Sequence, residues 1–363
     1  AMSGKQPFWN KKPSATIIAV FNDRTPARKD HPLLPPDDPL WNLLVKCWQG
    51  EPEDRPQMSE VFATTQDPEA ETDSLVQPGR KVQLPPEIPG TLEITGGSLG
   101  EGSFATVFEG VLTSPGGEKR PVAIKRVKLP GANIGHDQFR TRIKRETVIW
   151  TMVAHPNILP FIGYQIVNNA PLLVSPWCKN GNLSNYIQRN PNLTRSAKLE
   201  LLCHAARGLL HLHDLEPQIV HGDIKPENVI VQDNLVAALC DFGISKIHVE
   251  QHTGLTTSGL TSGTSGYQAK ELLDESPATP ATDVYAFGGL ILAAMSGKQP
   301  FWNKKPNTTI IAVWNDQTPV PKDHPKLPAS DPLWDLLRTC WSGEGENRPR
   351  MSAVLETVRS FWH

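Results

Sequence analysis

The sequence has few cysteines, no long apolar run and no excess of charge of either sign. Its five cysteines are an odd number and include no Cys-x-x-Cys pair, which argues against a disulfide framework and favours a reducing compartment. No apolar run reaches roughly 18 residues, so no segment is predicted to span a membrane. A net charge of −2 gives no reason to expect nucleic acid as a partner. The first residue is Ala rather than Met, so the predicted cytoplasmic location applies to this fragment alone.

The chain begins with a copy of a stretch near its end. The letters "AMSGKQPFWNKKP" occupy residues 1–13 and return unchanged at 294–306. The match continues without a gap at an offset of 293 residues, with 44 identities from Ala1 to Val61. A single repeat at this distance differs from the short-period repeats of solenoids and propellers. It indicates duplication of a larger unit, of which only the tail of the first copy is present.

The composition and the hydrophobic pattern of the sequence change near residue 91. Residues 63–90 are rich in Pro, Glu and Gln, lack a hydrophobic period and predict a disordered linker. Beyond them the patterns predict strands over 92–112 and 120–129, a helix over 138–154 and a strand over 171–177. A long helix is predicted over 196–215 and a hairpin over 228–240. The remainder is mainly helical. Strands first and helices after indicate an α+β unit with a small sheet lobe and a larger helical lobe.

Two motifs in the sheet region suit phosphate binding. "LGEGSFATV" places Gly100 and Gly102 between two strands, whereas a dinucleotide-binding loop precedes a helix. Glycines at a hairpin tip let backbone N–H groups approach phosphates, although a glycine-rich hairpin without a ligand is the alternative. "VAIK" on the next strand carries Lys125, and Glu146 on the predicted helix is a candidate partner that would hold the ammonium group toward phosphate oxygens. Two unrelated surface charges are the alternative.

A second set of polar residues lies on loops of the helical region. "HGDIKPEN" carries Asp223, Lys225 and Asn228, and Asp241 follows in "CDFG". Phosphoryl transfer needs charge neutralisation and in-line positioning, which such a set supplies. Asp241 and Asn228 offer the hard oxygen ligands that magnesium prefers, and Asp223 can orient a substrate hydroxyl and accept its proton. A polar loop stabilised by turn residues explains neither the lysine nor the spacing.

In order and context, these motifs resemble the protein-kinase signature set, over residues 92–363. The resemblance implies the bilobal kinase fold, with a β-rich N-lobe and a helical C-lobe, and ATP and Mg²⁺ as cofactors. It implies that Asp223 is the catalytic base, with Lys225 near the γ-phosphate. Lys125, held by Glu146, would bind the α- and β-phosphates. The implied magnesium ligands are Asn228 and Asp241, and the implied nucleotide-binding residues are Leu99, Gly100, Gly102, Val107, Ala123, Lys125, Ser175 at the gatekeeper position, Pro176 and Cys178.

Four departures from the family pattern matter. Ala105 replaces the third glycine of the phosphate-binding loop, and we expect this small residue to cost little. Gly222 replaces the arginine that usually precedes the catalytic aspartate and binds a phosphate on the activation loop, so we expect less dependence on that switch. "AKE" replaces the usual Ala-Pro-Glu, and its Glu271 is expected to pair with Arg348. Trp150 stands where an aliphatic residue is usual, on the helix that carries Glu146.

The motifs predict an ATP-dependent kinase that phosphorylates Ser or Thr hydroxyls of protein substrates in signalling. Lys225 and Thr264 stand at positions where the sequence resembles serine/threonine kinases. The stretches "HPNILPFIGY" and "DVYAFGGLIL" resemble those of the tyrosine-kinase-like group as expanded in mushroom-forming fungi. A pseudokinase or scaffold that binds ATP or partners without turnover is the alternative. A small-molecule kinase is a third, against which the activation-segment motif counts. Cys240 is interpreted as a small core residue, with reactivity toward electrophiles as the alternative.

In the resembling family, the repeated stretch forms the last helices of the large lobe. Residues 1–62, the copy of 294–355, are therefore predicted to be the truncated tail of a preceding kinase domain, before the linker at 63–90 and the kinase domain at 91–363. This tail lacks the helix on which its apolar face, which includes Leu40, Trp41, Leu44, Cys47 and Trp48, would pack. A loosely folded tail is the favoured prediction, because so few residues cannot enclose a core. Docking on the kinase, or self-association by domain swapping, are the alternatives.

Overall fold

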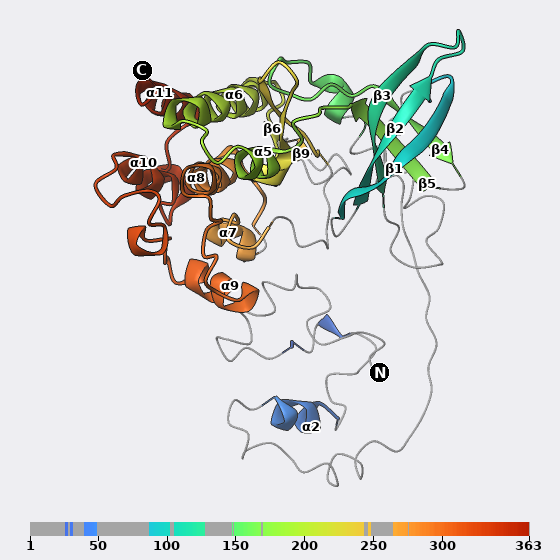
Figure 1. The fold of residues 1–363 in the computed structure, drawn as a ribbon. Coiled ribbons are helices and arrows are strands. Elements are labelled where there is room, and N and C mark those ends of the chain that lie inside the picture. Colours follow the sequence, from blue (N-terminus) through green and yellow to red (C-terminus); the bar gives the residue numbers. More distant parts are fainter. Residues whose placement is uncertain are drawn as a thin grey trace.

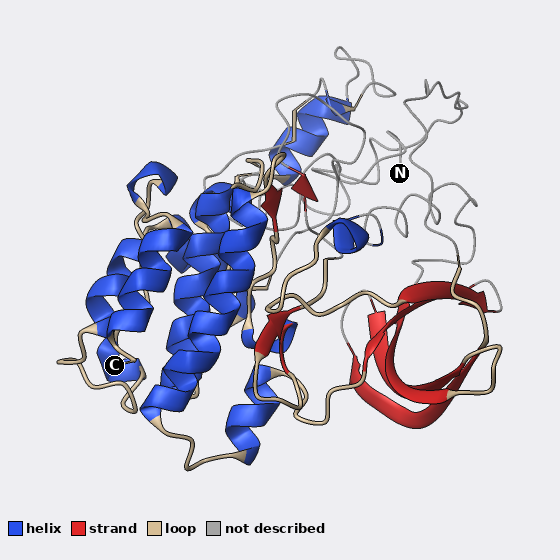
Figure 2. Cartoon of the chain, turned by 90° about the horizontal axis from the view of Figure 1, so that it is seen from above, coloured by secondary structure: helices blue, strands red, loops and turns tan. Residues whose placement is uncertain are grey.

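The chain forms a sheet lobe and a helical lobe that lie side by side (Figure 1). The computed structural model describes residues 26–27, 30–31, 40–48, 87–101, 105–127, 147, 149–167, 170–242, 246–247, 264–274 and 276–362. Seen from above, the sheet curls strongly and the helices form a separate block beside it (Figure 2). The predicted α+β architecture, with strands before helices, is confirmed. No helix of the described residues is long and apolar enough to cross a membrane.

The sheet lobe is a five-stranded antiparallel sheet in the order β1-β2-β3-β5-β4. Its strands are β1 (Thr91–Glu101), β2 (Ala105–Thr113), β3 (Lys119–Val127), β4 (Gly163–Val167) and β5 (Ala170–Pro176). In β3, Val122 and Ile124 are fully buried in a small apolar cluster, whereas Ala123 and Lys125 alternate with them and are half-buried. Because side chains alternate along a strand, this pattern directs Ala123 and Lys125 to the face opposite the cluster.

The residues immediately before β1 belong to the sheet lobe. Ile88 N donates to Tyr164 O at 3.0 Å, and Gln165 Nε2 donates to the carbonyls of Ile88 and Gly90, each at 2.9 Å. A Cβ on Gly163 would lie 1.9 Å from Ile88 Cγ2, so only glycine allows this close approach. These residues fall in the range predicted as linker, and in the structure they pack against β4.

The helical lobe is built around one almost entirely buried helix, α8 (Pro280–Ser296). A helix that is apolar on all sides belongs in the middle of a core. Its limits follow from its ends: Thr279 and Thr282 form a capping box, and Gly297 ends it in the left-handed conformation at φ 73°. The other helices are α5 (Leu183–Arg189), α6 (Arg195–Asp214), α7 (Lys270–Leu273), α9 (Pro306–Trp314), α10 (Leu333–Cys340) and α11 (Met351–Ser360).

Short strands and 3-10 turns complete the helical lobe, and those between residues 219 and 247 position the loops that face the sheet lobe. β6 (Ile219–Val220) pairs with β9 (Lys246–Ile247), and β7 (Val229–Val231) pairs with β8 (Ala237–Leu239). The 3-10 turns are η3 (Pro226–Asn228), η4 (Pro321–Asp323) and η5 (Gly345–Asn347). The β7–β8 pair and α6 confirm the predicted hairpin and long helix. The helix predicted over 138–154 lies mostly outside the described residues. Within this range, residues 147 and 149–152 are described as helical.

The repeat contributes one further helix, α2 (Leu40–Cys47). It begins and ends at the positions that, moved by 293 residues, are the ends of α10. The rest of the repeat is described only at residues 26–27, 30–31 and Trp48, so the prediction that this tail is loosely folded falls mainly on residues outside the described ranges.

Candidate active site

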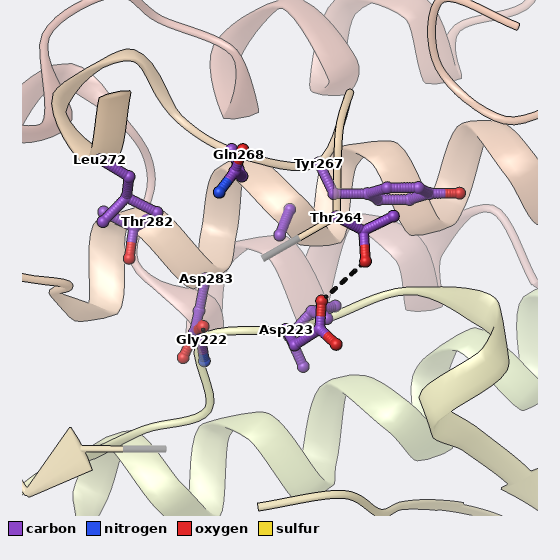
Figure 3. Close-up of a pocket in the computed structure, with 10 residues that line it drawn as sticks. Gly222, Asp223, Thr264, Tyr267, Gln268, Leu272, Thr282 and Asp283 are labelled. Carbon is purple, nitrogen blue, oxygen red and sulfur yellow. Dashed lines mark hydrogen bonds between the residues drawn. The ribbon is translucent and has the colours of Figure 1, made fainter. Parts of the chain in front are cut away.

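Three of the predicted site residues, the catalytic Asp223 and Lys225 and the metal ligand Asn228, meet on the loop between β6 and β7. Lys225 Nζ donates to Asp223 Oδ2 at 2.6 Å and to Thr264 Oγ1 at 2.7 Å. Thr264 Oγ1 in turn donates to Asp223 Oδ1 at 3.0 Å (Figure 3). Asn228 Nδ2 donates to Asp223 Oδ2 at 2.9 Å and to its carbonyl at 2.8 Å. The Asp223 carboxylate is therefore fixed by donors from three side chains, two of them on its own loop.

A buried carboxylate on α8 holds the turn that precedes Asp223. Asp283, 1% exposed, accepts from His221 N and Gly222 N, each at 2.8 Å, and lies 3.0 Å from His213 Nε2. Gly222 has φ 82°, a conformation that glycine adopts without strain. Figure 3 shows a small hollow beside Asp223, lined by residues that include Gly222 and Asp283. The sequence analysis missed Asp283, although it is the one charged residue of α8.

Asp241 lies beside the same loop, just beyond β8. Cys240 N donates to Asn228 O at 2.9 Å, which ties the two chain segments together. Asp241 has φ 67°, a left-handed conformation that is costly for a residue with a side chain and that often marks a functional site. Lys125 Nζ, from β3, forms an ion pair with Asp241 Oδ1 at 2.6 Å. This contact brings the sheet lobe and the helical lobe together at the predicted phosphate site.

Asn228 and Asp241 suit a magnesium ion. Because Asn228 donates through Nδ2 to Asp223, its amide oxygen is the atom left for a cation. The Asp241 carboxylate is 39% exposed. Magnesium is commonly held by one or two oxygen ligands together with water and substrate phosphates, so a denser cluster of acidic side chains is not required. The donor set fits the predicted ion.

Strand register gathers the residues predicted to contact the nucleotide. Val107 is paired with Lys125 across β2 and β3, and Ala123 is paired with Ser175 across β3 and β5. Directly paired residues point to the same face of a sheet, so these four side chains share the face opposite the apolar cluster. Gly100 is paired with Val107 on the other side. The pairing of β1, β2, β3 and β5 alone therefore assembles this surface.

The end of β5 continues this surface. Ser175 is 7% exposed, and Pro176 and Cys178 follow it, both half-buried. Burial, and then the charge of Asp233, raise the pKa of Cys178 to about 11. The Cys178 thiol is therefore protonated at neutral pH and is a poor nucleophile.

Some predicted site residues cannot be placed. Gly102 and Glu146 lie outside the described residues, and Leu99 is described only through its backbone in β1. The predicted ion pair between Lys125 and Glu146 therefore stays a prediction. The contact of Lys125 that the structure describes is the one with Asp241.

A column of rings joins the sheet lobe to the catalytic loop. Trp150 is 4% exposed, stacks on Phe161 with ring centroids 4.9 Å apart, and lies 6.0 Å from Phe242. Phe242 lies 5.3 Å from His221. Trp150 Nε1 donates to Leu159 O at 2.6 Å, which gives the indole nitrogen the partner that a buried polar group needs. The large side chain at this position therefore fits by stacking and by a hydrogen bond.

The predicted pair between Glu271 and Arg348 is confirmed. The Arg348 guanidinium, whose side chain is fully buried, donates to both Glu271 oxygens at 2.6 and 2.9 Å. Such bidentate pairs are among the strongest in proteins. Lys270, which replaces the usual proline, forms an ion pair with Asp316 at 2.7 Å. The altered triplet therefore keeps its structural contact and gains another.

Cys240 is partly buried and packs against the core of the helical lobe. Burial, and then the negative charge of Asp241, raise the pKa of its thiol. The thiolate is the reactive form of cysteine, so this shift disfavours the predicted alternative of reactivity toward electrophiles.

Known proteins are similar in sequence to most of the chain. The sequence model of the family described as protein tyrosine and serine/threonine kinase matches residues 94–358. Proline-rich receptor-like protein kinase PERK10 of Arabidopsis thaliana is 35% identical over 205 residues, which are 56% of this chain and 26% of that protein. Receptor-interacting serine/threonine-protein kinase 3 of Rattus norvegicus is 32% identical over 269 residues, 70% of this chain and 52% of that protein. Probable serine/threonine-protein kinase PBL15 of Arabidopsis thaliana is 28% identical over 283 residues, 73% and 65% respectively. The chain thus spans between 26% and 65% of the length of these relatives.

Proposed function

The chain belongs to the protein tyrosine and serine/threonine kinase family, and on this basis we propose that it is an ATP-dependent protein serine/threonine kinase acting in signalling. One observation carries the proposal. The Asp223 carboxylate is hydrogen-bonded to Lys225, Asn228 and Thr264 beside the Lys125–Asp241 ion pair, so a base, two cations and metal-ligand oxygens converge on one site. Phosphoryl transfer depends mainly on such positioning and charge neutralisation.

The chain's own residues divide the work of the reaction. Asp223 orients the acceptor hydroxyl and accepts its proton, and its fixed carboxylate makes this geometry available before the substrate arrives. Lys225 neutralises charge on the transferred phosphoryl group, and Lys125 binds the α- and β-phosphates. Asn228 and Asp241 would hold magnesium, which supplies further neutralisation of phosphate charge when bound. Ser175, Pro176 and Cys178 would receive the adenine.

Finer assignments are also proposals. The motifs near Ile158, Tyr285 and Arg348 favour the tyrosine-kinase-like group as expanded in mushroom-forming fungi. The repeat favours a division into a kinase-domain tail at 1–62, a linker that starts at 63 and a kinase domain that starts at β1. The low cysteine count favours a cytoplasmic location. Self-association through the repeated tail is a further proposal.

A transfer assay tests the function. Labelled γ-phosphate, Mg²⁺ and a generic basic protein are mixed with the wild type or with Asp223→Ala, and nucleotide binding is measured in parallel. We expect label on Ser and Thr with the wild type only, and nucleotide binding by both, because Asp223 is not a proposed metal ligand. Wild type that binds nucleotide but transfers no label would favour the scaffold alternative, which Gly222 and the altered triplet permit. Full activity in Asp223→Ala would contradict the mechanism.

A further inference from the structure

The two copies of the repeat differ only where the second copy is not buried. Among the 61 aligned pairs from 1–61 and 294–354, 17 differ. Twenty positions of the second copy are buried, and all twenty carry the same residue in the first copy. Since a third of the positions are buried, random scatter would place about six of the 17 changes there. In α10, for example, the changes fall at Asp335, Arg338 and Thr339, all exposed. The first copy has therefore kept the whole set of core-forming side chains.

The described residues of the first copy repeat the local geometry of the second. His31 and Trp41 meet edge-to-face at 5.8 Å and 68°, and their counterparts His324 and Trp334 do so at 6.3 Å and 63°. The backbone turn from Asp30 N to Ala27 O, 3.0 Å, matches one of 3.1 Å from Asp323 to Val320. The same side chains thus take the same arrangement in both copies.

The surface that receives the second copy is specific. A Cβ on Gly288 of α8 would lie 2.9 Å from Cys340 Cβ and 2.8 Å from Trp341 Nε1, so α10 lies directly against the α8 backbone. Arg348 is completely enclosed and pairs with Glu271. The surface therefore combines a close apolar contact with one carboxylate for an arginine. The first copy retains all three groups, as Cys47, Trp48 and Arg55.

We propose that residues 1–61 form a second C-lobe tail that packs on another copy of this chain, in the place of that copy's residues 294–354. Exchange of an identical element between copies preserves the contacts and is a low-cost route to a dimer. Core positions are sensitive to substitution, so a tail with all twenty unchanged can make the same interface.

A second copy is favoured over the same chain by the placement of the ends. Val61 corresponds to Val354 on α11, and Glu87 lies beside β4. α11 and β4 lie at opposite ends of the molecule (Figure 1), and the C-terminal end also lies on the side of the helices away from the sheet in the second view (Figure 2). Within one chain, residues 62–86 would have to stretch across the whole domain, whereas a second copy removes that restraint.

The test weakens one tail at a time in the full chain. Wild type, Trp334→Ala, Trp41→Ala and the double variant are compared by sedimentation from about 1 to 100 µM and by thermal unfolding. We expect Trp334→Ala to raise the dimer fraction at least about tenfold, because its own tail packs poorly while the tail of another copy is intact. Trp41→Ala and the double variant should both be monomeric over the whole concentration range, and the double variant should unfold first. The double variant also controls for non-specific association, since it carries the same damage at Trp334.

Two results would overturn the proposal. Trp334→Ala that unfolds as readily as the double variant would show that residues 1–61 do not replace the tail. Trp334→Ala that is as stable as the wild type but monomeric would place the replacement within one chain. A charge reversal gives an independent check: Glu271→Arg with Arg55→Glu should be stabilised only as a dimer, and Glu271→Arg with Arg348→Glu as a monomer. Stability of the Arg55→Glu pair no better than Glu271→Arg alone would count equally against the exchange.

Discussion

The two halves of the active site are held in place by different forces. In the helical lobe, side-chain hydrogen bonds fix the base: Asp223 is held by its neighbours, and Asp283 holds the turn before it. In the sheet lobe, backbone pairing does the same work, because the register of β3 sets Lys125 opposite Val107 and Ala123 opposite Ser175. A backbone ladder does not depend on any one side chain, whereas a buried hydrogen-bond network does. Single substitutions should therefore have different effects on the two halves of the site.

The largest contrast should come from the charged residue at the centre of each half. Asp223→Ala should lower the transfer rate by about 10²–10⁴-fold, the usual contribution of a positioned base, and leave nucleotide affinity nearly unchanged. Lys125→Met should weaken nucleotide binding as well, because the Lys125 ammonium group pairs with Asp241 at the proposed phosphate site. Nucleotide titration and initial rates on both variants check this. Equal affinities for the nucleotide in the two variants would remove the distinction.

Loss of the buried carboxylate behind the base should cost stability as well as rate. Asp283→Ala leaves the N–H groups of His221 and Gly222 buried without an acceptor. Each such group costs about 1–3 kcal/mol, so we expect a loss of about 3 kcal/mol in the free energy of unfolding. Asp335→Ala is the matched control, since its carboxylate is exposed and pairs on the surface with Arg338. The control should change the unfolding free energy by less than about 1 kcal/mol in denaturant titrations. Similar losses in both would show that Asp283 is not a structural anchor.

The glycine in the catalytic turn offers a finer comparison. Gly222→Ala should lower the free energy of unfolding by about 1–2 kcal/mol, because φ 82° is unfavourable for a residue with a Cβ. Gly117, in the turn between β2 and β3, has φ 83° and space around a new Cβ, so Gly117→Ala should lose a similar amount. Only Gly222→Ala should also lower the transfer rate, since Gly222 precedes the base. A rate loss in Gly117→Ala of the same size would attribute the effect to stability alone.

The sequence predicted the residues of short motifs better than the contacts that distant segments supply. Asp223, Lys225 and Asn228 share one short loop, and Glu271 and Arg348 stand in family motifs, so spacing and resemblance located them. Asp283 is 62 positions from the backbone N–H of His221 that it binds, and a single aspartate in an apolar helix signals burial without naming its partners. The packing of Ile88 on β4 was missed for another reason. Its surroundings are rich in proline and read as linker, and only the glycine at 163 makes the contact possible.

The smallest effect should come from a histidine pair where the two lobes meet. Burial, and then the nearby His211 and Arg207, lower the pKa of His155 below its ordinary value of 6.5. His155 stacks on His211 with ring centroids 4.8 Å apart, and its Nδ1 accepts from Asn157 N at 3.1 Å, a contact that requires an unprotonated nitrogen. Below about pH 6.5, His155 binds a proton in the unfolded chain more readily than in the folded chain. Stability therefore decreases as the pH is lowered from 6.5 to the pKa of His155 in the folded chain, and is constant below it.

His155→Asn isolates this contribution. An asparagine oxygen can replace the acceptor for Asn157 N but carries no charge at any pH. The loss of stability between pH 7 and pH 5 should be smaller in the variant than in the wild type, by about 0.5 kcal/mol at most because solvent screens this partly exposed ring, measured by denaturant titration at each pH. The subtraction is needed because burial also lowers the pKa of His204 and His324, which remain in both proteins. Parallel pH curves for the two proteins would mean that His155 is protonated as easily in the folded chain as in the unfolded one.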